Sequence, residues 1–350
     1  MKKYYTRACN FYYGSTSKEK IKKKLSLPLN GNSLISFDTL EIITRKSKKK
    51  IHISEIKNQS FNIKKKIKND IKLITKKKKF KGLSFLNFPI LMGIINLTPD
   101  SFSDGGKYNK KNLGFDRASY LIKKGCKILD IGGESTRPGA KNISKITEWK
   151  RINKTLKKVE KLNIFISLDT RKSWIMEKGI KNKVNLINDV SGFEYDSNTL
   201  NILKKHNIPF VIHHMRGTPK TMQKNPSYKN VLLDVYDFFE SKIKKIRSLG
   251  IKHNNIILDP GIGFGKNLKH NMTLISSISI FHSLGFNIML GVSRKRFIKD
   301  ISGNNDSKER LGGTISSSLY AMTQGIQMLR IHDANEVNQS IKVFKSLNFK

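Results

Sequence analysis

The sequence predicts an α/β chain that forms a (β/α)8 barrel, the TIM-barrel class, preceded by a short N-terminal β extension. Eight short apolar runs between residues 89 and 333 each end on polar residues, and stretches with helical periodicity separate them. Eight successive strand–helix units close into a barrel whose active site lies at the carboxyl ends of the strands. We therefore expect the polar residues that end the runs to meet at one mouth.

The expected strands share an apolar core followed by side chains that can carry chemistry. They cover Ile90–Leu97, Lys127–Gly132, Phe165–Asp169, Asn185–Val190, Pro209–Met215, Ile256–Pro260, Ile288–Ser293 and Gln327–His332. In the expected helices, apolar residues recur at spacings of three and four. These helices cover Phe115–Lys124, Ile146–Leu162, Trp174–Lys181, Thr199–Lys205, Val231–Leu249, Asn271–Ser283, Glu309–Gln324 and Asn335–Leu347.

The chain divides into three parts. A barrel needs about 250 residues, so the 350-residue chain leaves a surplus, which lies before the barrel at 89–350. Residues 31–88 are predicted to form a small basic β-rich extension, because 34–44 and 50–54 alternate like the strands of a hairpin. We expect it to plug or flank the bottom of the barrel; a lid or interface element is the alternative. The charged segment 1–30 is expected to be a partly disordered basic N-terminus.

The net charge of +42 suggests a polyanion partner, but the composition favours another explanation. Only 12 of the 68 basic residues are Arg and only five residues are Ala, which is typical of a very AT-rich genome. We interpret the lysine runs at 64–66 and 76–79 as solvated faces and expect no specific nucleic-acid partner. The positive field would attract an anionic substrate. The alternative, an RNA-associated protein, predicts salt-dependent polyanion binding by the isolated segment 1–88.

The two cysteines, Cys9 and Cys126, lie far apart and lack metal-ligand spacing, which favours a reducing compartment. No apolar stretch reaches the roughly 18 residues needed to span a membrane. We therefore expect a cytoplasmic protein of an AT-rich bacterium, without a membrane partner.

The strand ends carry long motifs in a fixed order. They are Asn96–Gly106 (NLTPDSFSDGG), Gly132–Ala140 (GGESTRPGA), Asp259–Lys266 (DPGIGFGK), Ser293–Lys295 (SRK) and Arg330–Asp333 (RIHD). Through them, over about residues 92–340, the chain resembles the dihydropteroate synthases, the folate-pathway enzymes of the pterin-binding barrel family. The glycine spacing in 261–266 fits neither a Walker loop nor a dinucleotide fingerprint.

The resemblance implies a transferase. The reaction joins 6-hydroxymethyl-7,8-dihydropterin diphosphate to p-aminobenzoate, giving 7,8-dihydropteroate and pyrophosphate, with Mg²⁺ as cofactor. Breaking the C–O bond beside the pterin separates charge, which fixed dipoles and ions in a dry pocket stabilise. Four residues are implied to carry the catalysis: Asp169, Lys295, Arg330 and His332.

Pterin binding needs carboxylates and amides that can pair with an amino-pyrimidinone edge. By resemblance, Asp169, Asn188 and Asp259 grip that edge, Lys295 bonds the carbonyl side, and Met215 lies against the ring as a polarizable apolar wall. A single Asp at a strand end is equally well explained as a helix cap; three polar residues at family positions favour the binding role.

Diphosphate binding needs cations and hydrogen-bond donors. Arg330 and His332 lie two residues apart, so their side chains leave the strand on the same face. By resemblance, they form a cradle with Arg137 and Asn96. Because Mg²⁺ prefers oxygen ligands and shares substrate phosphates, the Asn96 oxygen would suffice as the protein's metal ligand.

The p-aminobenzoate site needs a carboxylate receptor and a flat apolar slot. By resemblance, Thr136, Pro138, Phe264 and Ser293 supply them, and Phe102 and Asp104 close over them from the first loop. The same site would admit sulfonamides as mimics of p-aminobenzoate.

Three positions depart from the commonest family pattern: Arg171, Arg216 and Ile262. They bear on substrate and drug affinity rather than on the reaction type. The family also implies a homodimer. The second alternative function is another pterin-binding barrel, such as a methyltetrahydrofolate methyltransferase, which has no need of Arg137, Arg330 and His332 as a diphosphate cradle.

Overall fold

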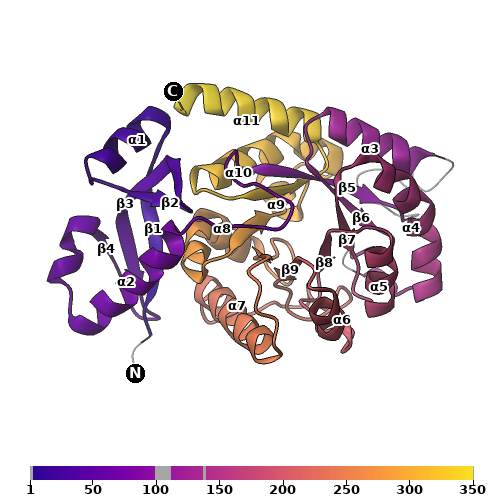
Figure 1. The fold of residues 1–350 in the computed structure, drawn as a ribbon, viewed down its shortest axis with the longest axis horizontal. Coiled ribbons are helices and arrows are strands. Elements are labelled where there is room, and N and C mark those ends of the chain that lie inside the picture. Colours follow the sequence, from indigo (N-terminus) through magenta and orange to yellow (C-terminus); the bar gives the residue numbers. More distant parts are fainter. Residues whose placement is uncertain (1–2, 99–111, 137–138, 350) are drawn as a thin grey trace.

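The structure, a computed structural model that describes residues 3–98, 112–136 and 139–349, contains a closed barrel of eight parallel strands (Figure 1). Neighbouring strands follow the order β10–β11–β12–β5–β6–β7–β8–β9, so consecutive strands pair and the last returns to the first. The strands are β5 (Ile90–Asn96), β6 (Ile128–Gly132), β7 (Phe165–Asp169), β8 (Leu186–Asp189), β9 (Phe210–His213), β10 (Ile256–Asp259), β11 (Asn287–Leu290) and β12 (Met328–Ile331). The predicted barrel is confirmed.

Helices follow the strands and cover the outside of the barrel. They are α3 (Leu113–Lys123), α4 (Lys145–Val159), α5 (Ser173–Lys181), α6 (Thr199–His206), α7 (Val231–Ser248), α8 (Leu268–Ser276), α9 (Arg296–Ser302), α10 (Leu311–Thr323) and α11 (Ala334–Asn348). The predicted helix Asn271–Ser283 is instead α8 followed by the 3₁₀ helix Ile278–Leu284, and α9 was not predicted. None of the helices in the described ranges is both long and apolar enough to cross a membrane.

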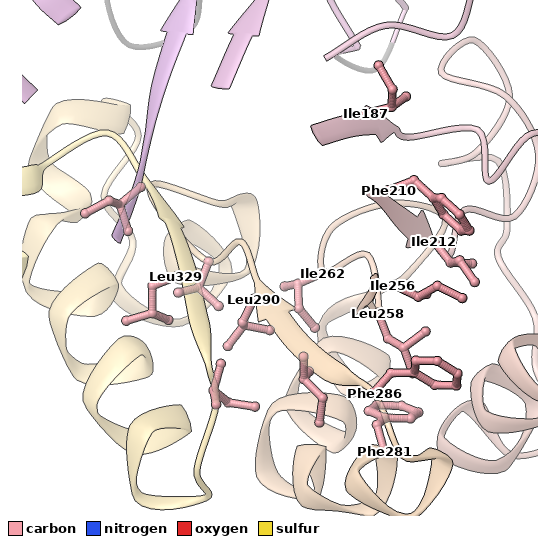
Figure 2. Close-up of a cluster of buried hydrophobic side chains, with 14 of the residues drawn as sticks. Ile187, Phe210, Ile212, Ile256, Leu258, Ile262, Phe281, Phe286, Leu290 and Leu329 are labelled. Atoms are coloured by element: carbon pink, nitrogen blue, oxygen red, sulfur yellow. The ribbon is translucent and has the colours of Figure 1, made fainter. Parts of the chain in front are cut away.

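Strand side chains alternate between two apolar layers. Outward-facing residues such as Leu258, Leu290 and Leu329 pack against the helices, and Figure 2 shows part of this layer. Inward-facing residues near the start of the strands, such as Met92, Val211 and Met289, form a separate cluster that fills the lower barrel. The apolar filling of the lower half leaves the upper half of the interior for polar residues.

The N-terminal residues form an ordered module of β1 (Tyr5–Tyr13), α1 (Gly14–Lys22), β2 (Leu27–Leu29), β3 (Asn32–Ile43), β4 (Lys48–His52) and α2 (Phe61–Thr75). β3 is the central strand: β1 pairs with one side of it, and β2 and β4 pair antiparallel with it as well. The predicted hairpin between 34–44 and 50–54 is present. The prediction of disorder within 1–30 is wrong for residues 5–29, because β1 completes the sheet and buries Ala8 with Leu40 and Ile67.

The module lies beside the barrel, next to α8 and α10 (Figure 1). Tyr5 packs edge-to-face on Tyr236 with ring centroids 5.2 Å apart, and the Ser279 hydroxyl donates to the Ala8 carbonyl over 2.9 Å. The segment after α2 places Phe80 and Phe85 against the lower barrel cluster. The extension therefore flanks the barrel with its sheet and plugs the bottom with its linker. Lys78 in this linker is only partly exposed, and its ammonium donates to the Phe286 carbonyl over 2.7 Å.

Candidate active site

Polar side chains occupy the upper barrel interior, at the carboxyl ends of the strands. Inward-facing positions two residues apart carry Met92 and Ile94 on β5, and Ile128 and Asp130 on β6. The same alternation turns a set of polar residues inward, each buried: Asp130, Ser167, Asp169, Asn188, His213 and Asp259. Burying so many polar groups is costly unless they bond one another or a ligand. Their concentration at one end of the barrel marks a binding site.

Arg330 on β12 bonds two of these carboxylates. Its Nε donates to Asp130 Oδ2 over 2.6 Å, and its Nη2 donates to Asp169 Oδ2 over 2.8 Å. Asp130 also accepts from the Ser167 hydroxyl over 2.6 Å and from the Asn188 amide over 3.1 Å. Asp130 is thus fully engaged within the protein, whereas the buried Asn188 Oδ1 has no protein partner among the described residues. That oxygen is free to accept from a ligand.

Two carboxylates at this site, Asp169 and Asp259, are hard to ionise. Burial, reinforced by the negative charge of Asp130, raises the pKa of Asp169 to about 7 despite the opposing charge of Arg330. Burial also raises the pKa of Asp259, although the Gly261 amide donates to its Oδ1 over 2.8 Å. A ligand that offers N–H donors would stabilise both carboxylates in their charged form.

A cation and an aromatic ring form one wall. The Lys295 ammonium lies 4.2 Å from the centre of the Phe264 ring, and the His213 ring meets the same phenyl edge-to-face at 4.6 Å. Burial and the nearby Arg330 charge lower the pKa of Lys295 to about 8. This wall offers a flat apolar face beside a donor, which suits a planar heterocycle.

Above the inner cavity the cleft continues to a second, wider chamber. Thr136, Phe264, Ser293, Lys295, Arg330 and His332 line both parts. The His332 Nδ1 lies 3.0 Å from the Ser293 hydroxyl, and burial followed by the charge of Arg330 lowers the pKa of His332 well below its usual value. His332 is therefore a neutral imidazole held by Ser293.

Most of the predicted site residues meet here. Asn188 and Asp259 line the inner cavity, and Asn96 and Asp169 line the outer chamber, in addition to the shared residues above. Four predicted residues lie outside the described part of the chain: Phe102, Asp104, Arg137 and Pro138.

The role of Met215 as an apolar wall stays a prediction. Met215 lies beyond the end of β9 and is not among the described residues that line either part of the cleft. His213, the last residue of β9, faces the cavity and has a buried Nδ1 without a protein partner among the described residues. The inward alternation from Val211 would have indicated His213, because residues two apart share a face.

Sequence reasoning also missed the roles of Asp130 and Glu134. Asp130 has the same inward register as Ile128 and lies in the middle of an apolar run, where an acidic residue signals a buried polar network. Glu134 lines the outer chamber and bonds Arg171, one of the positions that departs from the common family pattern.

Comparison with known proteins agrees with this geometry. Residues 92–332 match the family model described as pterin binding enzyme. The chain is 39% identical over 267 residues to a dihydropteroate synthase of Neisseria meningitidis serogroup B, covering 75% of this chain and 94% of that protein.

Solved structures are similar over the same region. The Yersinia pestis dihydropteroate synthase in a sulfonamide drug complex has a TM-score of 0.74 and 33% identity, covering 77% of this chain and 98% of that one. The Thermus thermophilus enzyme matches with 4-aminobenzoate (TM-score 0.68, 33% identity, 76% and 96% covered) and with 6HMPPP (TM-score 0.65, 30% identity, 76% and 96% covered). This chain belongs to the pterin-binding enzymes, in the family of the dihydropteroate synthases.

Proposed function

We propose that the chain condenses 6-hydroxymethyl-7,8-dihydropterin diphosphate with p-aminobenzoate to give 7,8-dihydropteroate and pyrophosphate, a step of folate biosynthesis. The observation that carries the proposal is the pair of buried carboxylates, Asp130 and Asp169, joined by Arg330 beneath a cleft that opens towards Asn96 and His332. Carboxylates in a closed pocket suit the donors of a pterin, and the Arg330 guanidinium with the hydrogen-bonding side chains at the outer edge suits a diphosphate. The named complexes of the relatives contain ligands of the same kinds.

The pterin would occupy the inner cavity. Asp259 and the free Oδ1 of Asn188 accept its N–H groups, and Asp169 accepts another once the ligand offsets the cost of burying its charge. Lys295 donates to the carbonyl side, while the Phe264 ring covers one face. Because these groups come from separate strands of a closed barrel, their positions are held before the substrate arrives.

The diphosphate would lie in the outer chamber against Arg330 and His332. Arg330 has its guanidinium on Asp130 and Asp169 in this structure. When pterin N–H groups take over part of that carboxylate charge, the guanidinium becomes available to the diphosphate oxygens. The C–O bond to the pterin methylene breaks and pyrophosphate leaves with the electron pair of that bond. The amine nitrogen of p-aminobenzoate bonds the same carbon and loses one proton, which passes to the released pyrophosphate or to water. Fixed charges on both sides of the breaking bond lower the barrier.

We propose that magnesium is held mainly by the substrate. Asn96 offers one neutral oxygen at the outer chamber, and the described residues contain no group of three or more histidine, cysteine or carboxylate side chains that could hold an ion. This donor set fits Mg²⁺, which usually keeps waters and shares phosphates. When bound, the ion would neutralise charge on the leaving diphosphate.

The p-aminobenzoate would enter through the outer chamber. Thr136 and Ser293 bring hydroxyl groups to the lining that the two parts of the cleft share, where they can donate to a carboxylate, and the Phe264 ring offers an apolar face for the aromatic ring. A sulfonamide has the same aniline ring and would compete for this slot.

We further propose a cytoplasmic homodimer. The two cysteines are buried and unpaired, which suits a reducing compartment. An apolar groove crosses α8, α9 and α10, and its exposed side chains include Met272, Ile301 and Tyr320. Apolar patches of this kind mark interaction surfaces, and a second copy of the chain would bury it.

The experiment is product analysis. The purified full chain is incubated with the dihydropterin diphosphate, p-aminobenzoate and Mg²⁺, and dihydropteroate is identified by chromatography and mass. Product that disappears when either organic substrate is omitted supports the proposal. Pterin binding without product would overturn it in favour of another pterin-binding barrel.

A further inference from the structure

We propose that Arg171 is a positioning residue for the p-aminobenzoate side of the cleft: it ties together the two ends of the loop that follows β6 and thereby holds Thr136 in place. The inference rests on the proposed function for the identity of the substrate. The contact network itself stands on geometry alone.

The network centres on Glu134, whose side chain is 3% exposed. Arg171 donates to its Oε2 from Nη2 over 2.7 Å and from Nε over 3.2 Å. The other oxygen, Oε1, lies 2.9 Å from the Lys172 ammonium and accepts from the Ile143 amide over 3.1 Å. Burial raises the pKa of Glu134, but the hydrogen bonds from Arg171 and Lys172 outweigh it and lower that pKa. Glu134 is therefore a charged anchor.

These contacts close the loop at its base. Glu134 lies at the start of the loop, and Ile143 and Asn142 lie at its end, just before α4. Arg171 reaches both sides, because its Nη2 also donates to Asn142 Oδ1 over 3.2 Å. The guanidinium on the segment after β7 thus adds a second tie between the two ends of the loop, beside the direct bond from the Ile143 amide to Glu134.

Arg171 is itself held in position. Its guanidinium carbon lies 4.2 Å from the centre of the Tyr195 ring, and its side chain is 4% exposed. A planar guanidinium with a stacked aromatic ring loses little freedom for each bond it makes. This arrangement gives the loop a rigid support from the neighbouring strand end.

The loop leads directly to the cleft. Glu134 lines the outer chamber, and Thr136, two residues later, lines both the inner cavity and the outer chamber beside Ser293 and Phe264. Arg171 follows Asp169 by two residues. The contacts of Arg171 with Glu134 and Asn142, which we call the clamp, therefore also position this loop relative to the carboxylate that ends β7.

Arg171 and Lys172 differ in what their removal would leave behind. Lys172 lies between two buried carboxylates, 2.6 Å from Glu148 Oε2 and 2.9 Å from Glu134 Oε1. Removing it would leave the buried Glu148 without the ammonium that balances its charge, which is strongly destabilising, whereas Glu134 would keep Arg171. Removing Arg171 leaves Glu134 with Lys172 and the Ile143 amide. Substitution of Arg171 therefore tests positioning in a protein that retains the rest of the network.

The test compares Arg171→Ser and Arg171→Lys with Arg7→Ser in the full chain. Arg7 is a matched control, because its Nε bonds the buried Glu41 over 2.7 Å in the N-terminal module, away from the cleft. Amide hydrogen exchange of residues 134–143 is followed without substrate, with α3 as an internal reference. Steady-state kinetics then give KM for each substrate and kcat.

We expect faster exchange in residues 134–143 of Arg171→Ser but not of Arg7→Ser, and an increase of about three- to tenfold in KM for p-aminobenzoate, the size of effect that loss of preordering produces. Because ground-state and transition-state binding weaken together, kcat should stay within about twofold. Arg171→Lys should show smaller increases in exchange and in KM, because it keeps a positive charge. If Arg171→Ser does not fold, Arg171→Lys is the variant that tests the proposal.

Unchanged exchange in a folded Arg171→Ser variant would overturn the clamp. Faster exchange with an unchanged KM for p-aminobenzoate, or equal increases in KM for both substrates, would overturn its positioning role. If the unaltered chain forms no dihydropteroate, the proposed function fails, while the exchange result still decides the clamp.

Discussion

Arg330 donates from Nη2 to Asp169 Oδ2 over 2.8 Å, which joins the last strand of the barrel to β7, whose terminal carboxylate is proposed to bind the pterin. The same guanidinium donates from Nε to Asp130 over 2.6 Å. One cation therefore balances two carboxylates where a charged substrate is expected, and stability and binding depend on the same side chain.

Replacing Arg330 should lower both the stability of the protein and its affinity for the substrate. Arg330→Ala leaves Asp130 without its cation in the barrel interior, and removing one partner of a buried ion pair costs about 3–5 kcal/mol. We expect a decrease of that size in the free energy of unfolding, measured in urea. Calorimetric titration should show a larger loss of affinity for the dihydropterin diphosphate than for the free dihydropterin. Equal losses for the two ligands would contradict the role in diphosphate binding.

Pterin binding should depend on pH through Asp169. Burial and Asp130 raise the pKa of Asp169 to about 7, so Asp169 is protonated at lower pH and loses its capacity to accept two N–H bonds. Affinity for 6-hydroxymethylpterin should therefore rise with pH up to about 7, by up to about tenfold per pH unit. Above about pH 8, the pKa to which burial and Arg330 lower Lys295, affinity should fall again. Titration of Asp169→Asn should lack the rising limb; a rising limb that persists would rule out Asp169 as its source.

Gly261 should be intolerant of a side chain. Its φ is +67°, and an added Cβ would lie 1.9 Å from the His214 carbonyl oxygen. Gly303 is a matched control, because its φ is +79° but an added Cβ would meet no atom within 4 Å. Gly303→Ala should cost about 1–2 kcal/mol of unfolding free energy through left-handed strain alone. Gly261→Ala should cost clearly more and reduce turnover, because Asp259 bonds the Gly261 amide. Equal costs would mean that the loop moves to accept the methyl group.

The N-terminal strand should contribute to the stability of the barrel. Tyr5 is 1% exposed, packs on Tyr236 and bonds Asp237 through its hydroxyl at 3.0 Å. Tyr5→Ala should lower the unfolding free energy by about 3–5 kcal/mol, as expected for a large buried aromatic residue. Phe61→Ala is the control, since Phe61 is 77% exposed on α2. A small effect at Tyr5 would show that the module is only loosely attached.

The proposed dimer makes a separate prediction. Ile301→Lys places a charge in the groove across α8, α9 and α10, where Ile301 is 60% exposed. Val343→Lys is the control, because Val343 is 56% exposed on α11 and outside that groove. Sedimentation velocity should show a dimer for the unaltered chain and for Val343→Lys, and a monomer for Ile301→Lys. A dimer that survives in Ile301→Lys would place the interface elsewhere.

The barrel could be predicted because its signals are local. Each strand is a short apolar run that ends on a polar residue, and β7 was predicted with the observed bounds Phe165–Asp169. Strand ends were harder to predict: the strand expected to run to Met215 ends at His213 in the structure. The strand itself is set by its apolar run, whereas its end depends on pairing with the neighbouring strands.

The folded structure of the N-terminal segment could not be predicted from its composition. Polar and aromatic residues in β1 follow no regular alternation. The strand is stabilised by pairing with β3, some thirty residues away, and by the contact with Tyr236 in the barrel. The Glu134–Arg171 contact was missed for the same reason, because it joins the ends of two separate strands. Long-range partners of this kind are visible only once the topology is known.

The most direct test of the central claim is pyrophosphate release by the purified chain with the dihydropterin diphosphate and Mg²⁺, measured with and without p-aminobenzoate. The account predicts rapid release only when p-aminobenzoate is present, with one dihydropteroate formed for each pyrophosphate. Absence of release, or release that p-aminobenzoate does not accelerate, would contradict the assignment of this cleft to amine transfer.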